Sequence, residues 1–244
     1  MKVLLLAGTA EARALAARLK GDRRFEVVAS LAGAIRAPAA YAVPVRFGGF
    51  GGTPGLVKFI EDNAVGGVID ATHPFARVMP RRAQAVCAGL GLPYLRLDRP
   101  GWTPGPGDRW RFVEGAAEAG EEIAPGARVF LATGARSLGD FAALAARRYV
   151  VARVIDPPDR PFPFPRGQWL VGRPPFTEAD EIATLRAHRI DVLVAKNAGG
   201  PADAKLAAAR ALGLPVVLLN RPPPPPGDRV ESVAAALAWL ERLA

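Results

Sequence analysis

KVLLLAGTAEA, residues 2–12, decides the fold, because an apolar run of β type passes directly into a small-residue turn and then into a helical pattern. Two later stretches repeat the strand-to-turn pattern: VIDATHPFA at 68–76 and VLVAKNAGG at 192–200. Each apolar run predicts a buried parallel strand. In open α/β sheets ligands bind just beyond the carboxyl ends of the strands, so all three turns are candidate ligand contacts.

The alternation of strand and helix patterns continues along the chain and is typical of parallel sheets with helices on both faces. The first part predicts strands near 3–6, 25–29, 43–47, 67–69 and 93–97, and helices near 11–20, 53–63 and 75–89. The second part predicts strands near 111–113, 129–131, 149–154, 169–171, 192–194 and 216–219, and helices near 115–123, 137–146, 177–188, 201–212 and 229–242.

A stretch dense in Pro and Gly, RPGWTPGPGDR at 99–109, separates the two parts. Such a stretch makes a poor helix or strand and is typical of a linker. We therefore predict an α/β fold of two Rossmann-like domains with parallel sheets. Residues 1–100 would bind a nucleotide, residues 101–244 would bind substrate, and a cleft would lie between the domains.

The charge pattern favours an anionic small molecule. The chain of 244 residues has a formal net charge of +9, with its arginines scattered in single positions and short pairs. A solvated, Arg-rich surface is the alternative interpretation. Nucleic acid is disfavoured, because there is no basic run with interleaved aromatics and no helix-turn-helix or zinc-finger spacing.

Several classes of protein are disfavoured by what the sequence lacks. No apolar run is long enough to span a bilayer, and the chain starts directly with a strand pattern rather than a signal peptide. The single cysteine, Cys87, is expected to be a small buried hydrophobe. There is no Cys/His metal spacing, no G-x-S-x-G elbow and no Walker A loop. These features predict a cytoplasmic protein that is neither a metalloenzyme nor a serine hydrolase.

The first turn is a candidate phosphate site, made of Gly8, Thr9, Ala10 and Glu11. A helix N-terminus that follows a strand through Gly offers N–H groups and a positive dipole end to an anion. Only Gly8 of the G-x-G-x-x-G fingerprint is present, and Thr9 could simply cap the helix.

The turn after the second strand would read the adenosine ribose. It contains Ser30, Gly33 and Arg36, and there is no Asp or Glu between residues 27 and 60. A carboxylate would favour the free 2′-hydroxyl of NADH, whereas Ser and Arg suit the 2′-phosphate of NADPH. The alternative is an ordinary polar loop.

Two further segments could contact a nicotinamide. GGFGG at 48–52, with Gly49, Phe50 and Gly51, permits close backbone approach to a ligand or is a flexible connection. Thr72, His73 and Pro74 follow the fourth strand. His73 could contact a ligand or transfer a proton, or it could cap a helix that Pro74 begins. The other histidine, His188, is expected at the surface.

The second domain has two turns that also follow predicted strands and contain small and basic residues. Thr133, Gly134 and Arg136 follow one strand, and Lys196, Asn197 and Gly199 follow another. Lys and Arg attract carboxylate or phosphate, and the alternative is a pair of tight turns with solvated cations.

Taken together, the chain resembles the precorrin-6A reductase family of cobalamin biosynthesis. The similarity runs through LLLAGTAEA, VRFGGFGG, VIDATHPFA, RPGWTPGPGDRW, VFLATGARSL, VARVIDPP, VAKNAGG and AKLAAARALGLPVVLLNRP, in order. DATHPFA with a later KNAGG is the specific combination.

This resemblance implies NADPH-dependent reduction of one double bond of the precorrin-6A macrocycle, giving precorrin-6B, or of the cobalt-containing analogue. The substrate is an anionic tetrapyrrole, which suits the basic charge. The family often has Arg directly after the Ser-x-Ala-Gly turn, where this chain has Ala34, so Arg36 is expected to take over the 2′-phosphate.

Two alternatives stay open: another NAD(P)-dependent oxidoreductase on the same scaffold, and a non-catalytic nucleotide sensor. The sequence leaves the oligomeric state, the proton donor and the presence of cobalt in the substrate undecided.

Overall fold

The computed structural model describes residues 1–33 and 39–243 and divides them into two compact units. Unit 1 consists of Met1–Pro100 and Pro222–Ala244, and unit 2 consists of Gly101–Arg221. Each unit is built on a six-stranded sheet in which all the pairings are parallel. The predicted class, α/β with two parallel sheets, is confirmed.

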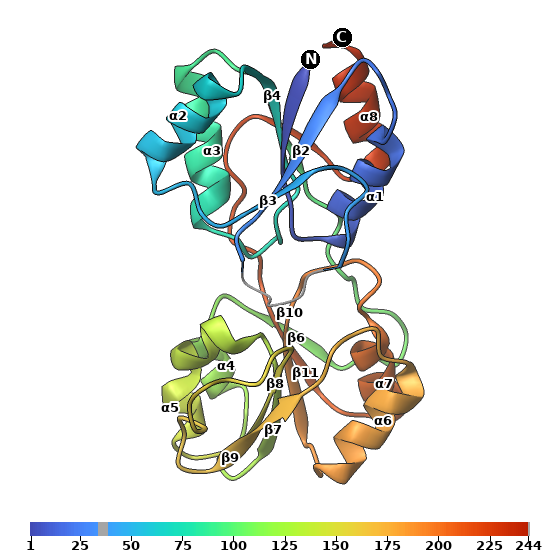
Figure 1. Ribbon diagram of the computed structural model, residues 1–244. Helices are drawn as coiled ribbons and strands as arrows, with labels where there is room; N and C mark the ends of the chain where they lie inside the picture. Colours follow the sequence, from blue (N-terminus) through green and yellow to red (C-terminus); the bar gives the residue numbers. More distant parts are fainter. Residues whose placement is uncertain (34–38, 244) are drawn as a thin grey trace. The chain divides into compact units, whose positions relative to one another are not determined.

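Unit 1 has the strand order β12-β5-β4-β1-β2-β3. Its elements are β1 (Lys2–Leu6), α1 (Ala10–Leu19), β2 (Glu26–Leu31), β3 (Val45–Phe47), α2 (Thr53–Asp62), β4 (Val65–Asp70), α3 (Val78–Gly89), β5 (Tyr94–Leu97), β12 (Asp228–Val230) and α8 (Val233–Glu241). Figure 1 shows α2 and α3 on one face of this sheet and α1 and α8 on the other.

The alternation of side chains along β1 explains why both faces are covered. Val3 and Leu5 pack with α1 and α8, whereas Leu4 and Leu6 pack with α2 and α3. None of the four is more than 2% exposed. Since burying a Val or Leu side chain contributes about 1.5–3 kcal/mol, this strand needs an apolar layer on each side.

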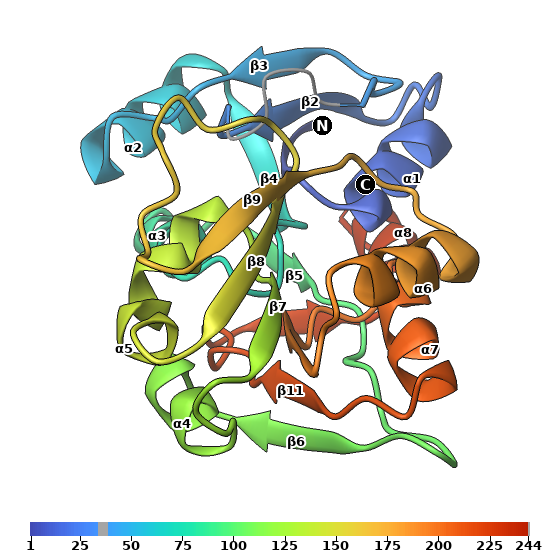
Figure 2. The ribbon, with the colours of Figure 1, turned by 90° about the horizontal axis from the view of Figure 1, so that it is seen from below.

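Unit 2 has the strand order β6-β11-β10-β7-β8-β9. Figure 2 labels all of these strands except β10. Its elements are β6 (Trp110–Val113), α4 (Ala116–Glu121), β7 (Arg128–Ala132), the 3₁₀ helix η1 (Ala135–Phe141), α5 (Ala142–Ala145), β8 (Tyr149–Val154), β9 (Gly167–Val171), α6 (Glu178–Ala187), β10 (Val192–Lys196), α7 (Ala204–Ala211) and β11 (Val216–Leu219). The helices α6 and α7 cover one face, and α4 and α5 cover the other.

The break predicted at residue 100 coincides with a boundary between the two units, but the C-terminal segment does not belong to the second unit as predicted. Residues 222–244 belong to unit 1, because β12 pairs with β5 and the side chains of Trp239 and Leu240 on α8 enter the core beside α1. The expected helix at 229–242 is wrong at its start, because Asp228–Val230 forms this strand and the helix begins at Val233.

Two helices also differ from their predicted starts or form. The helix expected from Phe75 begins at Val78, so Pro74 does not start it. The stretch expected as one helix at 137–146 is a 3₁₀ helix that passes into one short α-helical turn.

Candidate functional site

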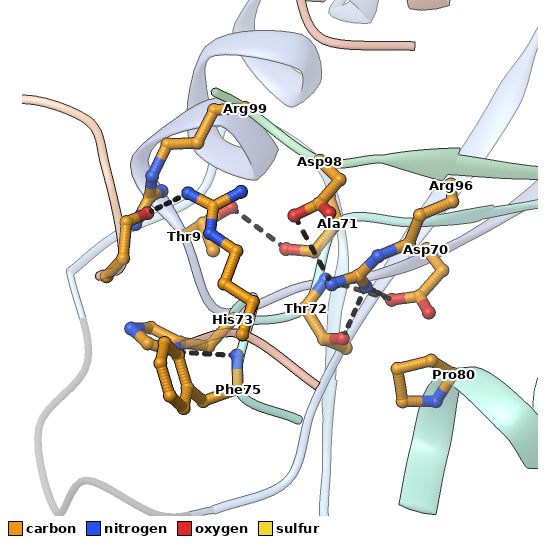
Figure 3. A network of polar contacts seen from close by, with 12 residues as sticks. Thr9, Asp70, Ala71, Thr72, His73, Phe75, Pro80, Arg96, Asp98 and Arg99 are labelled. Atoms are coloured by element: carbon orange, nitrogen blue, oxygen red, sulfur yellow. Dashed lines mark hydrogen bonds and ion pairs between the residues drawn. The ribbon is translucent and has the colours of Figure 1, made fainter. Parts of the chain in front are cut away.

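The site in unit 1 lies where the strand order reverses. β2 and β3 extend the sheet on one side of β1, and β4 lies on the other side. Ligands of doubly wound folds bind at such a switch point, beyond the carboxyl ends of the two strands. The turns that follow β1 and β4 are joined there, because the Oγ1 of Thr9 donates a hydrogen bond of 2.9 Å to the carbonyl of Ala71 (Figure 3).

The turn after β1 fits a diphosphate. Gly8 has φ of 141°, which side-chain-bearing residues rarely adopt, and no heavy atom lies within 4 Å of a Cβ built there. Thr9 caps α1, its Oγ1 accepting from the N–H of Ala12. The N–H groups of Ala10 and Glu11 in the first helical turn have no intrahelical partner by the geometry of a helix start. An exposed glycine followed by such a helix start suits an anion.

A buried polar network supports the turn after β4 (Figure 3). Asp70, fully buried, pairs with Arg96 of β5 at 2.7 Å, and Arg96 is 3% exposed. The same guanidinium donates to the Oγ1 of Thr72 at 2.8 Å. Asp70 also accepts from the N–H of Thr72 at 3.0 Å and from the hydroxyl of Tyr94 at 2.9 Å. Burial, and then the negative charge of Asp70, raise the pKa of Tyr94, so its hydroxyl remains a donor.

This network determines the conformation of the turn that carries His73. An isolated buried charge is expensive, so Asp70 and Arg96 depend on each other. Since both also bind Thr72, the ion pair holds the backbone immediately before His73 in one arrangement.

His73 lies on the exposed side of this turn and is not the helix cap. Its Nδ1 accepts from the N–H of Phe75 at 3.2 Å, and Arg77 occupies the N-cap position of α3. Pro74 is buried. With Nδ1 acting as an acceptor, the neutral imidazole has its proton on Nε2.

The ends of β2 and β3 contain a cation that the sequence reasoning missed. Ser30 is 6% exposed, and its hydroxyl accepts from Arg46, its neighbour on β3, at 2.8 Å. Gly33 is exposed and has φ of 70°. Arg36 lies outside the described residues. The side chain of Arg46 also donates to the carbonyls of residues 48 and 49.

The glycine loop is anchored by its aromatic residue. Phe50 packs edge-on against Phe59 of α2 with ring centroids 5.3 Å apart. Gly49 and Gly51 are exposed, and a Cβ built on either would meet no atom within 4 Å. The loop therefore combines a fixed aromatic with an open backbone.

Glu11 has a structural partner. Its carboxylate forms an ion pair with Arg99, which follows β5. The pair joins the first turn of α1 to the end of β5, so the Glu11 carboxylate is already engaged within unit 1.

Unit 2 has its own switch point, between β7 and β10. Lys196, at the end of β10, donates from Nζ to the carbonyl of Thr133 at 2.7 Å and to the hydroxyl of Ser137 at 3.1 Å. The turn after β7 continues through Gly134, with φ of 83°, into η1. Within the described part of the chain, the buried Oγ1 of Thr133 has no hydrogen-bond partner.

Three other residues of unit 2 were predicted to contact a ligand: Asn197, Gly199 and Arg136. The Asn197 amide accepts from the N–H of Trp102 at 2.7 Å and donates to its carbonyl at 3.3 Å, so it fixes the start of the unit. Gly199 is buried and has φ of 64°. Arg136 is exposed.

Residues 1–33 and 39–243 contain neither a cluster of metal-ligating side chains nor a membrane-spanning helix. No group of three or more His, Cys, Asp or Glu side chains there could hold a metal ion. No helix in those ranges is both long and apolar enough to cross a membrane.

The missed residues had a weak sequence signal. Arg96 and Arg46 each interrupt an otherwise apolar strand, and Asp70 ends one. A charge inside such a strand signals a buried partner or a site. Which residue is that partner depends on the strand order, and the local pattern does not contain the order.

Two doubly wound units with ligand-type turns at their switch points define a Rossmann-like α/β protein. The chain matches the family described as precorrin-6x reductase CbiJ/CobK over residues 2–241. It is 46% identical to a precorrin-6A reductase of Rhodococcus erythropolis, over 99% of this chain and 98% of that protein. The chain belongs to this family of oxidoreductases.

Other relatives of the chain carry names of the same kind. A precorrin-6A reductase of Rhodobacter capsulatus is 46% identical over 98% of this chain and 95% of its own length. A solved structure titled CobK precorrin-6A reductase superposes with a TM-score of 0.93 at 43% identity and covers 100% of this chain and 97% of that one. A cobalt-precorrin-6A reductase of Priestia megaterium is 31% identical, over 90% of each chain.

Proposed function

We propose that this protein reduces one double bond of the precorrin-6A macrocycle with NADPH, giving precorrin-6B in cobalamin biosynthesis. The observation that carries the proposal is the 46% identity to a precorrin-6A reductase over 99% of the chain. The metal-free macrocycle is favoured as substrate, because the relatives named for it are 41–46% identical and those named for the cobalt form 26–31%.

The described residues of unit 1 fit a nicotinamide dinucleotide. Backbone N–H groups from Gly8 to Ala10 would bind the pyrophosphate at the start of α1. Thr72, His73 and the loop at 48–52 would border the nicotinamide. When bound, NADPH supplies the hydride. The protein's part is to hold donor and acceptor in close, aligned contact.

His73 is the candidate catalytic residue. Its ring lies beside the proposed nicotinamide position and would orient that ring or relay a proton. His73→Ala should lower kcat more than it changes KM for the macrocycle. Turnover at the parent rate from pH 6 to 8 would remove His73 from the chemistry.

The second unit would contact the macrocycle, a polycarboxylate suited to a protein of net charge +9. Lys196 and Arg136 would pair with peripheral carboxylates, beside Thr133, Gly134 and Gly199. Lys196 acts through binding, because its ammonium is already held by two oxygen acceptors and is poorly suited to be a nucleophile. The amide of Asn197 would hold this turn through its two hydrogen bonds to the backbone of Trp102.

The test is a turnover assay at 340 nm with metal-free precorrin-6A and with its cobalt form, each with NADPH and with NADH. We expect rapid NADPH consumption with the metal-free substrate and formation of a dihydro product by mass spectrometry. Nucleotide binding without turnover of either macrocycle would indicate the sensor instead. Turnover only with the cobalt form would correct the substrate.

A further inference from the structure

Arg46 is a half-buried cation at the place where doubly wound folds read the adenosine ribose. It lies on β3, directly beside Ser30 of β2, at the carboxyl ends of both strands. No carboxylate pairs with it in the described part of the chain. Burial lowers the pKa of its guanidinium, the effect expected of a charge that has lost water and gained no counter-charge.

The hydrogen bonds of Arg46 leave one side of the guanidinium open. Nη1 donates to the hydroxyl of Ser30 at 2.8 Å and to the carbonyl of Gly48 at 3.1 Å, and Nη2 donates to the carbonyl of Gly49 at 3.0 Å. Of the five N–H donors of an arginine, the one on Nε and the second on Nη2 remain without a partner among the described residues. These two donors form the edge that binds a phosphate in a bidentate manner.

The surroundings hold this edge rigidly and keep space near it. The guanidinium carbon lies 4.0 Å from the ring centroid of Phe50 and 5.2 Å from that of Phe59. Stacking on two rings restricts the side chain before any ligand arrives. Exposed glycines follow directly in the loop, where a Cβ on Gly49 or Gly51 would meet nothing within 4 Å.

We propose that Arg46, with Ser30, recognises the 2′-phosphate of the nucleotide and makes the protein selective for NADPH. The inference rests on the proposed function for the presence of a nicotinamide dinucleotide. It goes beyond that function by assigning the selectivity to a rigid residue on a strand.

The experiment measures the binding of 2′,5′-ADP and of 5′-AMP by calorimetry, two probes that differ only in the 2′-phosphate. Arg46→Met keeps an apolar side chain on Phe50 but removes the charge and the donors. It should weaken 2′,5′-ADP about ten- to hundredfold and change 5′-AMP less than about threefold. Arg46→Lys should recover only part of the loss, because a lysine lacks the planar fork.

Arg23→Met is the matched control. It removes one exposed positive charge from the loop before β2, at the amino end of the strand whose carboxyl end holds Ser30, and should leave both affinities unchanged. Equal weakening of both probes by Arg46→Met would overturn the assignment, because Arg46 would then only pin the loop. Selectivity lost in Arg36→Met and kept in Arg46→Met would overturn it as well.

The binding of the two probes by the parent protein distinguishes failure of the Arg46 assignment from failure of the proposed reductase activity. A parent protein that binds both probes equally, yet reduces precorrin-6A, would refute the role of Arg46 and leave the proposed function standing. A parent protein that binds neither probe and does not oxidise NADPH in the presence of precorrin-6A would refute both.

Discussion

Replacing Arg96 by Met should strongly destabilise unit 1, because it leaves the Asp70 carboxylate buried without its cation. Asp70 is 0% exposed and Arg96 is 3% exposed, so water does not replace the lost partner. The variant loses the 2.7 Å ion pair with Asp70, the 3.8 Å pair with Asp98 and the 2.8 Å hydrogen bond to Thr72. Asp70 keeps only the N–H of Thr72 and the hydroxyl of Tyr94.

The size of the expected loss of stability follows from the burial of Asp70 and Arg96. Removing one member of a buried ion pair costs about 3–5 kcal/mol, a large part of the 5–15 kcal/mol that stabilises a typical domain. Urea denaturation followed by circular dichroism measures the loss. Hydrogen exchange of peptides from β4 and β5, compared with peptides from β10, localises it to unit 1. We expect the β4 and β5 amides to lose protection while β10 keeps it.

A double variant and a control variant test whether the buried ion pair causes this loss of stability. In the double variant Arg96→Met with Asp70→Asn, the cost should be smaller than the sum of the single costs by about 1–3 kcal/mol, because the residues act on each other. Arg24→Met, which breaks an exposed pair with Asp22, should leave the urea midpoint nearly unchanged. A loss below 1 kcal/mol for Arg96→Met, or strictly additive costs, would show that the buried pair does not support this turn.

Three further predictions concern other parts of the chain. Gly8→Val should abolish NADPH binding in calorimetry while circular dichroism stays native, because φ of 141° and a branched side chain both oppose the phosphate-binding turn; normal binding by a folded variant would sink the assignment. Lys196→Met should raise KM for precorrin-6A about tenfold, less at high salt, with NADPH affinity constant; a rise that salt leaves unchanged would speak against charge pairing. Cys87 should react with a thiol reagent at pH 8 about a thousandfold more slowly in the native protein than in urea, because burial raises its pKa to about 12. Because the thiol ionises near pH 9 in the unfolded chain and near 12 in the folded protein, its contribution to the free energy of unfolding falls as pH rises between those values. Equal labelling rates in both states would refute its burial.

The sequence predicted the repeating elements well because their signals are local. An apolar run such as Val3–Leu6 followed by Gly and a helical period is enough to define one βα unit, and repetition implies a parallel sheet. The assignment of residues 222–244 failed for the opposite reason. β12 has only three residues, and its partner β5 lies more than a hundred residues earlier in the chain. A pairing at that distance leaves no periodic pattern.

In the candidate site, too, the residues with a local sequence signal could be predicted, whereas those that depend on strand pairing could not. Gly8, Thr9, Thr72 and Lys196 could be predicted as candidates because each lies at or just after the end of a recognisable strand, and the switch points bring the turns together. Arg46 and the Asp70–Arg96 pair were missed, because their meaning depends on which strands are neighbours. Once β3 lies beside β2 and β5 beside β4, a charge inside an apolar strand acquires a defined partner.

The two switch points are built alike but offer different chemistry to an anion. Each is closed by one hydrogen bond to a backbone carbonyl, from Thr9 to Ala71 in unit 1 and from Lys196 to Thr133 in unit 2. In unit 1 the closing group is a neutral hydroxyl, and a ten-residue α-helix follows the turn, so the anion would meet directional backbone N–H groups. In unit 2 the closing group is itself the cation, and the turn enters a 3₁₀ helix with no side-chain cap. Fixed N–H groups suit a pyrophosphate of one geometry, whereas an ammonium is a point charge that can pair with carboxylates in several orientations. This difference is the physical reason for assigning the nucleotide to unit 1 and the polycarboxylate macrocycle to unit 2.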